Sequence, residues 1–315
     1  MKSPYKPIDL KGLKTYPLSE RKSKVSTSDF AKSWEKGASF DQFLDRLPEI
    51  LAAADIRKVI SALTKAFQEE KTIVMAMGAH VIKVGLNPVV IDLMERGLLS
   101  GVAMNGAGII HDLEIAMTGQ TSEDVACALN DGSFGMAHET GAFLSEAIEY
   151  AGNSSSGLGE AVGHQILQQK LPLMENSILA AGARLDIPVT VHVALGTDII
   201  HMHPDFDAGH AGKASHRDFR ILSALISTLE DGVYMNVGSA VILPEVFLKA
   251  VTLVRNLGYR LKKFTTVNMD FIQHYRPMVN VVNRPTAEGG RGFNLVGHHE
   301  IMLPLIAAGV IEQLN

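Results

Sequence analysis

The sequence contains a single cysteine, Cys127, among its 315 residues, so an intrachain disulfide is excluded. Because the neighbours of Cys127 are apolar, we expect a buried and inert thiol, and such sparse cysteine use is typical of a reducing cytoplasm. Long apolar runs are also lacking, since no stretch reaches the roughly 18 residues that span a bilayer. Residues 1–24 lack the apolar centre of a secretory signal. The sequence therefore predicts a cytoplasmic protein with no membrane partner.

Positive charge is not in excess. The chain has 29 Lys and Arg against 34 Asp and Glu, whereas general nucleic-acid binders are usually basic, so we expect no nucleic-acid partner. The charge is unevenly spread, because residues 1–36 hold nine of the cations and four of the anions. We expect residues 1–39 to form a basic, partly ordered arm and residues 40–315 to form a single domain with a large core.

Two common catalytic signatures are missing, the G-x-S-x-G nucleophile elbow and the G-x-x-x-x-G-K-[ST] phosphate loop. What the sequence does contain is an alternation of short, nearly continuous apolar runs with helical patterns. The strand-like runs lie at 71–80, 98–106, 187–195, 232–240 and 260–270. This alternation predicts an α/β protein with a Rossmann-like, doubly wound parallel sheet that has helices on both faces. Between the strands we expect helices, among them one that Asn87 caps and one that Ser215 caps.

Ligands of such sheets bind at the carboxyl ends of the strands. Those ends are unusually rich in glycine and small polar residues, which we expect to face a ligand. They are Gly78, His80, Asn105, Gly106, Ala107, Gly108, Thr197, Asp198, Gly238, Ser239, Asn268 and Asp270.

The turn Asn105–Gly108 is open to two interpretations. Its two glycines, followed by a helix N-terminus, are typical of a cradle for a nucleotide phosphate. However, His111 stands where the fingerprint G-x-G-x-x-G needs its third glycine, and a tight strand-to-helix turn explains the same residues. Asp112 also lies near the start of this helix, where a carboxylate is favoured by the helix dipole whether or not a cofactor binds.

Residues 192–218 are rich in histidine and aspartate and include the pair His201-x-His203. These side chains are common ligands of zinc, so a metal-dependent hydrolase is one hypothesis. No H-E-x-x-H signature accompanies them, and we favour a polar loop without metal that contacts the substrate.

A second glycine-rich stretch covers residues 283–305. Its loop Gly289–Gly292 could hold an anion through backbone N–H groups and Arg291. The neighbouring His298 and His299 point about 100° apart on a helix, so they do not suit one metal. The stretch is either an active-site loop or a long connection that caps the last helix.

The order of these pieces resembles the deoxyhypusine synthase family over residues 40–310. The resemblance is carried by "IVMAMGAHVIKVGLNPVVIDLMERGLLSGVAMNGAGIIHDLEIAMTG", by "IPVTVHVALGTD" and by "DFRILSALISTLEDGVYMNVGSAVILP". It implies an NAD-binding, Rossmann-like fold in a homotetramer whose sites lie at subunit contacts. It also implies oxidation of spermidine and transfer of an aminobutyl group through an imine on a lysine. The NAD-contacting positions would be His80, Asn105, Gly106, Ala107, Gly108, Thr197, Asp198, Asn268 and Asp270, with Gly238 and Ser239 near the polyamine.

The family's C-terminal lysine and tryptophan are absent. The last lysine of the chain is Lys263 and the only tryptophan is Trp34. A Schiff base needs an amine nucleophile, and an arginine stays protonated. Lys83 and Lys213 are the only lysines near predicted strand ends. Each is either a nucleophile that replaces the family's lysine or an ordinary surface residue.

The sequence thus predicts an NAD-dependent transferase or oxidoreductase that acts on a small unknown substrate and is not a true deoxyhypusine synthase. His201 or His203 would serve as general base, because imidazole exchanges protons near neutral pH. The expected catalytic residues are His201, His203, Asp198, Glu288 and Arg291. The alternatives are the metal-dependent hydrolase and a non-catalytic nucleotide-binding homologue.

Overall fold

The computed structural model describes residues 4–314 and has one six-stranded sheet at its centre. All its neighbouring strands pair in parallel, in the order β3-β2-β1-β4-β5-β6. The strands are Ile73–Met77 (β1), Gly101–Asn105 (β2), Val189–His192 (β3), Val233–Val237 (β4), Thr265–Asp270 (β5) and Arg291–Val296 (β6). The predicted α/β class with a parallel, doubly wound sheet is confirmed.

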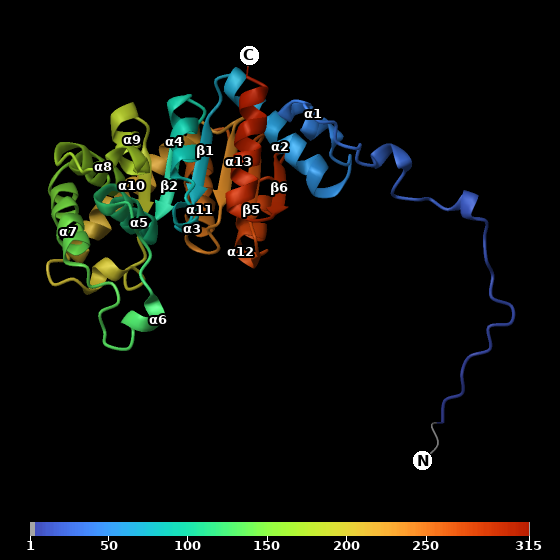
Figure 1. Ribbon diagram of the computed structural model, residues 1–315, viewed down its shortest axis with the longest axis horizontal. Coiled ribbons are helices and arrows are strands. Elements are labelled where there is room, and N and C mark those ends of the chain that lie inside the picture. Colours follow the sequence, from blue (N-terminus) through green and yellow to red (C-terminus); the bar gives the residue numbers. More distant parts are fainter. Residues whose placement is uncertain (1–3, 315) are drawn as a thin grey trace.

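Helices cover both faces of the sheet (Figure 1). They are α1 (Phe40–Arg46), α2 (Leu51–Gln68), α3 (His80–Lys83), α4 (Asn87–Glu95), α5 (Gly106–Thr118), α6 (Val125–Ala128), α7 (His138–Asn153), α8 (Leu158–Gln168), α9 (Ile178–Leu185), α10 (Ala208–Ser227), α11 (Ile242–Asn256), α12 (Tyr275–Pro277) and α13 (His299–Glu312). A π-helical turn, Met278–Asn283, follows α12.

The side chains of the central strand β1 alternate between two apolar clusters. Ile73, Met75 and Met77 join the cluster of α2, α4, α5 and α13. Val74 and Ala76 join the second cluster, which α10 and α11 complete. Since successive side chains of a strand point to opposite faces, both faces of β1 are buried. This double burial explains why the strand reads as an uninterrupted apolar run.

The glycine-rich stretch at residues 283–305, expected to be a loop ahead of the last helix, contains the sixth strand. β6 pairs with β5 over its whole length, from Arg291 opposite Thr265 to Val296 opposite Asp270. It is an edge strand and half of its residues are exposed, so it lacks the apolar pattern that marks a buried strand. The interpretation as one continuous loop was therefore wrong.

Three local expectations also need correction. Ser215 lies inside α10, where its hydroxyl bonds to the β3 backbone, and the helix is capped by Asp207 instead. Asn87 is the first residue of α4 and its buried amide donates to Asp112 rather than capping the helix. Cys127 is exposed on α6, because that short helix lies on the surface, and its thiol donates to Asp124.

Residues 4–39 form an arm outside the core and contain two short 3-10 turns, Leu18–Glu20 and Thr27–Asp29 (Figure 1). Residues 4–28 are exposed throughout. The arm is tied to the body where the backbone N–H of Lys32 donates to the carbonyl of Arg46 at 2.9 Å. No helix within residues 4–314 is both long and apolar enough to cross a bilayer.

Two buried carboxylates fasten helices to one another. Asp112 on α5 accepts hydrogen bonds from the Ser177 hydroxyl at 2.6 Å and from the backbone N–H groups of Ile178 and Leu179 at 2.9 and 3.1 Å. It therefore caps α9 and not its own helix. Burial raises the pKa of Asp112 to about 6. Both of its oxygens are thus hydrogen-bonded to groups of the protein.

Asp218 on α10 is the second such group. Its carboxylate accepts from the backbone N–H groups of Val191 at 2.9 Å and Gly159 at 3.1 Å, which joins α10 to β3 and to the start of α8. Burial raises the pKa of Asp218 to about 7. A folded-state pKa above the unfolded value means that the folded protein binds the proton more tightly. The stability that this group contributes is therefore complete below pH 4 and is lost as the pH rises through 7.

We expect Asp218→Asn to remove this pH dependence, because an amide oxygen can still accept both N–H bonds and cannot ionise. Urea unfolding between about pH 4 and 7 should show the free energy of unfolding of the variant rising relative to the wild type. The slope should approach ~1.4 kcal/mol per pH unit, the value for one proton. Asp205→Asn, an exposed carboxyl, is the control. Parallel curves for wild type and Asp218→Asn would contradict the prediction.

Candidate functional site

The centre of the carboxyl edge lies between β1 and β4, which are neighbours in the sheet. The helices that follow them, α4 and α11, pack on opposite faces of the sheet. The two strand ends touch through backbone alone. A β-carbon placed on Gly78 would lie 2.2 Å from the carbonyl oxygen of Gly238, and the N–H of Gly78 donates to Val237 at 2.9 Å. Gly238 has φ +68°, a conformation that favours glycine. The edge between these two strand ends is therefore bare backbone, which suits a close ligand, and we call it the crevice after the place where such sheets bind their ligands.

Aromatic rings stand around the crevice. The imidazole of His80, at the start of α3, lies 5.4 Å from the ring of His299 and 5.6 Å from that of Phe271. The ring of His298 stacks on Phe271 at 6.2 Å. These side chains follow β1, β5 and β6, so the parallel sheet brings them to one edge from distant parts of the sequence.

His299 is completely buried at the start of α13. Its Nε2 donates to the carbonyl of Met269 at 3.2 Å and lies 3.9 Å from an oxygen of Asp270. Burial lowers the pKa of His299, although these two acceptors act against it. The ring is therefore neutral at pH 7, and its Nδ1 has no hydrogen-bond partner within residues 4–314. His299 is held in one orientation, packed against Gly238 and His80.

Of the predicted cofactor residues, the structure brings Gly78, His80, Gly238, Ser239 and Asp270 together at this crevice. Ser239 follows Gly238 and its hydroxyl accepts from the N–H of Leu243 at 3.2 Å, at the start of α11.

Asn268 belongs to the sheet rather than to the crevice. It forms a ladder of side-chain amides with its lateral neighbours, accepting from Asn236 on β4 and donating to Asn294 on β6, both at 2.8 Å. The three residues are in register across the strands. Asn268 is buried, and its role in the structure is to join three strands.

The turn after β2 carries a carboxylate of the protein itself. The side chain of Asn105 accepts from the N–H of Gly108 at 3.1 Å and so caps α5. A β-carbon on Gly106 would lie 2.0 Å from an oxygen of Asp198, so Asp198 covers this helix start. Burial raises the pKa of Asp198, and one of its oxygens has no partner among the described residues.

Two further predicted residues lie beside this turn. Ala107 is in the first turn of α5. Thr197 is exposed, and its hydroxyl donates to the carbonyl of Ala194 at 2.6 Å. The predicted phosphate cradle at Asn105–Gly108 is therefore occupied in part by side chains of the protein.

The predicted catalytic histidines point to different places. Nδ1 of His201 accepts from the N–H of Gly196 at 3.0 Å, and the ring packs on Phe206 at 4.7 Å. The Nε2 of His203 lies 3.0 Å from the carbonyl of Gly135. Within residues 4–314 no group of three or more histidine, cysteine or acidic side chains could hold a metal ion. His201 and His203 thus contact different parts of the chain and do not converge on one point.

Glu288 and Arg291 lie at the opposite edge of the sheet. Arg291 is the first residue of β6, and the amino ends of parallel strands face away from the crevice. Six strand residues, about 20 Å of extended chain, separate it from His298 and His299. The predicted catalytic set is thus distributed over three places.

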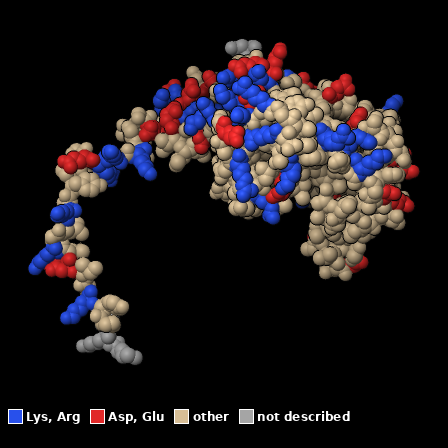
Figure 2. Space-filling view, turned by 180° about the vertical axis from the view of Figure 1, so that it is seen from behind, with Lys and Arg blue, Asp and Glu red and all other residues tan. Residues whose placement is uncertain are grey.

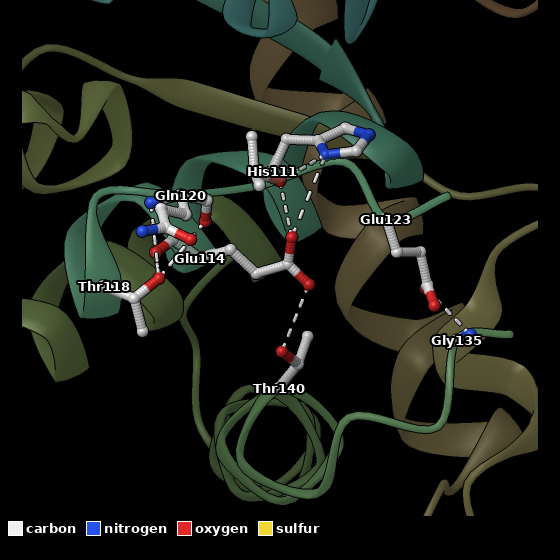
Figure 3. Close-up of polar contacts among 8 residues, drawn as sticks. His111, Glu114, Thr118, Gln120, Glu123, Gly135 and Thr140 are labelled. Atoms are coloured by element: carbon white, nitrogen blue, oxygen red, sulfur yellow. Dashed lines mark hydrogen bonds and ion pairs between the residues drawn. The ribbon is translucent and has the colours of Figure 1, made fainter. Parts of the chain in front are cut away.

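A polar cluster that joins α5 to the loop after it and to α7 was not predicted (Figure 3). Nδ1 of His111 lies 2.6 Å from the hydroxyl of Thr121 and 4.0 Å from the carboxylate of Glu114. Thr140 donates to the other oxygen of Glu114 at 3.3 Å. Burial, and then the charge of Lys83, lower the pKa of His111 to about 4. The spacing of His111 and Glu114, one helical turn apart, was the available signal.

The two lysines considered as relocated nucleophiles differ in surroundings. Lys83 is exposed at the end of α3, near His111. Lys213 lies in α10 and donates to the carbonyl of Gly152 in α7.

No protein-family model matches the sequence, and no curated protein matches it. Solved structures are similar in fold. The complex of AgrE with ornithine and NAD+ has a TM-score of 0.53 at 13% identity, over 83% of this chain and 33% of that one. ArgZ, an arginine dihydrolase from cyanobacteria, has a TM-score of 0.51 at 15% identity, over 82% of this chain and 31% of that one.

The chain thus spans about a third of the length of these two proteins, and at such identity the likeness shows the fold alone. A protein of Entamoeba histolytica provisionally assigned as a deoxyhypusine synthase covers 90% of this chain and 96% of its own. Its TM-score of 0.49 at 11% identity is too low to support an inference.

The contact between the two strand ends predicts a large effect of Gly78→Ala. The added methyl group would meet a backbone oxygen that cannot rotate away, so β1 and β4 must separate, and we expect a loss of about 3 kcal/mol or more in the free energy of unfolding. The control is Gly85→Ala, at φ +78° with no atom within 4 Å of the new carbon. Backbone strain alone should cost it about 1–2 kcal/mol. Equal losses in urea unfolding would show that the strand ends do not constrain each other.

Proposed function

We propose that this chain is an NAD-binding enzyme, a transferase or oxidoreductase acting on a small molecule, with the dinucleotide in the crevice between β1 and β4. One observation carries the proposal. The strand order β3-β2-β1-β4-β5-β6 is that of dinucleotide-binding sheets, whose ligand lies where the order reverses, and this point has a glycine on each side. NAD is the cofactor that the family resemblance implies.

The residues at the crevice fit a pyrophosphate. No residue within 4–314 accepts a hydrogen bond from the backbone N–H of Ala79 or His80, so both are available to an anion. The turn after β2 is less suitable, since the carboxylate of Asp198 covers it. At the end of β2, where dinucleotide sites usually hold an acid against the ribose, Asn105 keeps its Nδ2 as a donor while its Oδ1 caps α5.

When bound, NAD supplies a hydride acceptor. We propose that His80 takes the proton from the substrate, because imidazole serves this role near neutral pH and the ring stands at the crevice. His299 would position His80 through the packing of the two rings. His201 and His203 follow β3, two strands from β1, so His80 is the better placed base.

The rim of the crevice favours a neutral or partly apolar substrate over a polyamine. Phe271, Ile272, Tyr275 and Val296 are all exposed there, between 44% and 72%. A spermidine site would need several carboxylates, and Asp270 is buried beside His299.

Exposed apolar surface of this kind also marks protein contacts, and we propose that copies of the chain meet at this rim in a homotetramer.

Titration with NAD, followed by calorimetry and thermal unfolding, tests the proposal. Ala79→Asp should weaken binding at least tenfold, because its carboxylate would repel the pyrophosphate, while at an uncapped helix start it should not harm folding. Ala137→Asp is the matched control, since Ala137 also precedes a helix without a side-chain cap. NAD at 100 times its dissociation constant should add about 2.7 kcal/mol of stability.

No stabilisation of the wild type by NAD would contradict the proposed cofactor. NADP and FAD serve as the other arms, and binding of either in place of NAD would reassign the cofactor. Binding of NAD without turnover on any compound would favour the non-catalytic homologue.

We also expect no deoxyhypusine synthesis. With spermidine, NAD and the acceptor protein, mass spectrometry should find no aminobutyl-lysine, because the crevice lacks the family's lysine. Formation of that product would overturn this part of the proposal. In a panel of alcohols and amines that yields NADH, His80→Asn should lose at least 100-fold in kcat, a usual contribution of a general base, whereas His201→Asn should retain activity.

A further inference from the structure

A cavity of about 640 Å³ opens at the amino edge of the sheet, opposite the crevice. One wall is helix α2 and the other is the start of β5 and β6, with the loop Gly289–Gly290 between them. Its volume is that of a small-molecule pocket, which usually measures about 300–1,000 Å³. The proposed function makes no use of it.

The cavity is lined by more cations than anions. Five basic side chains face two acidic ones, an excess of three positive charges. The basic residues are Arg57, Lys58, Lys65, Lys263 and Arg291, and the acidic residues are Glu49 and Asp231. The whole chain carries a net charge of −5, so this excess is local.

Arg57 is fixed in place. Its guanidinium donates to the carbonyls of Leu44 and Pro48 at 2.9 and 2.6 Å and lies 3.0 Å from Glu49. Glu49 is thus already paired. The side chain of Arg57 is a rigid part of the wall and contributes charge more than free donors.

The remaining cations are available. Lys58 and Lys65 pair with Asp55 and Glu69 at 3.1 and 3.7 Å, but their side chains are 61% and 71% exposed, and such surface pairs are weak. Lys263 and Arg291 have no ion-pair partner within residues 4–314, and both are exposed.

The glycine loop leaves room but offers no backbone donors. A β-carbon on Gly289 would meet only the side chain of Lys263, at 3.9 Å. The N–H groups of Gly290 and Arg291 already donate to Thr286 and Phe264, both at 3.0 Å. An anion in this cavity would therefore be held by side chains, in contrast to the backbone cradle expected from the sequence.

We propose that this cavity is a second ligand site, for a small molecule with two or more adjacent negative charges, such as a phosphorylated or polyphosphate metabolite. Arg291 supplies a planar fork suited to phosphate, and the lysines supply point charges. The site is concave, and over α1 and α2 acidic side chains stand among the basic ones (Figure 2). A long nucleic acid requires a continuous basic face, so the small anion is the better fit.

Calorimetric titration of the full chain with inorganic pyrophosphate and tripolyphosphate tests the site. The wild type should bind one equivalent, and Lys263→Gln combined with Arg291→Gln should weaken binding about 100-fold, since each charge-assisted contact contributes roughly tenfold or more. Lys170→Gln combined with Arg220→Gln removes the same charge from exposed positions outside the cavity and should leave binding within twofold. Lys65→Gln, on the other wall, should weaken it several-fold.

The anion site in the cavity is tested independently of NAD binding at the crevice. NAD binding should be unchanged in the Lys263 and Arg291 double variant. The proposal is overturned if the wild type binds neither anion at millimolar concentration, or if both double variants weaken binding equally. Loss of pyrophosphate binding through Ala79→Asp, with the cavity variant unaffected, would place the anion at the β1–α3 turn and also overturn it. Thermal unfolding of each variant without ligand shows whether it folds.

Discussion

The approach of two glycine backbones at the ends of β1 and β4 is the constraint on which the rest of the carboxyl edge depends. A side chain on Gly78 would collide with the backbone oxygen of Gly238, and a side chain on Gly238 would meet the ring of His299. The floor of the crevice is therefore peptide groups, and the chemically active side chains must come from the residues that follow. His80, Phe271 and His299 occupy those positions. The geometry of one backbone contact thus decides which residues can reach a ligand.

A parallel sheet has two chemically distinct edges, and the chain places different charges on each. The carboxyl edge carries histidines and apolar rings, and the amino edge carries a cavity with an excess of cations. Arg291 and His298 are close in sequence but lie at opposite ends of β6. Sequence reasoning grouped them in one loop, because an exposed edge strand lacks the continuous apolar run that burial on both faces imposes. The five strands with that run were predictable.

The contacts that a polar side chain makes at a strand end were less predictable than the strand itself. Asp112, Asn268 and His80 all qualified as ligand contacts on sequence grounds. In the structure Asp112 caps α9, Asn268 joins three strands, and only His80 stands at the crevice. A buried carboxylate or amide must be satisfied by hydrogen bonds, and its partners here lie 25 to 67 positions away. Short-range sequence patterns do not identify such distant partners. The sequence therefore predicts the α/β class, but it predicts the site only in part.

The carboxylate of Asp198 explains why the turn that most resembles a nucleotide cradle is not the best place for one. A helix N-terminus attracts an anion. At the start of α5 the carboxylate of Asp198, which belongs to the protein itself, lies against Gly106. His111 also stands at the position of the third glycine. With the carboxylate of Asp198 beside it, the start of α5 offers an anion neither the space nor the positive electrostatic potential of the usual fingerprint. The turn after β1 retains free amides and a bare backbone. The same strand order can thus be combined with different open turns, because the residues at the edge of the sheet determine which helix start keeps free amides.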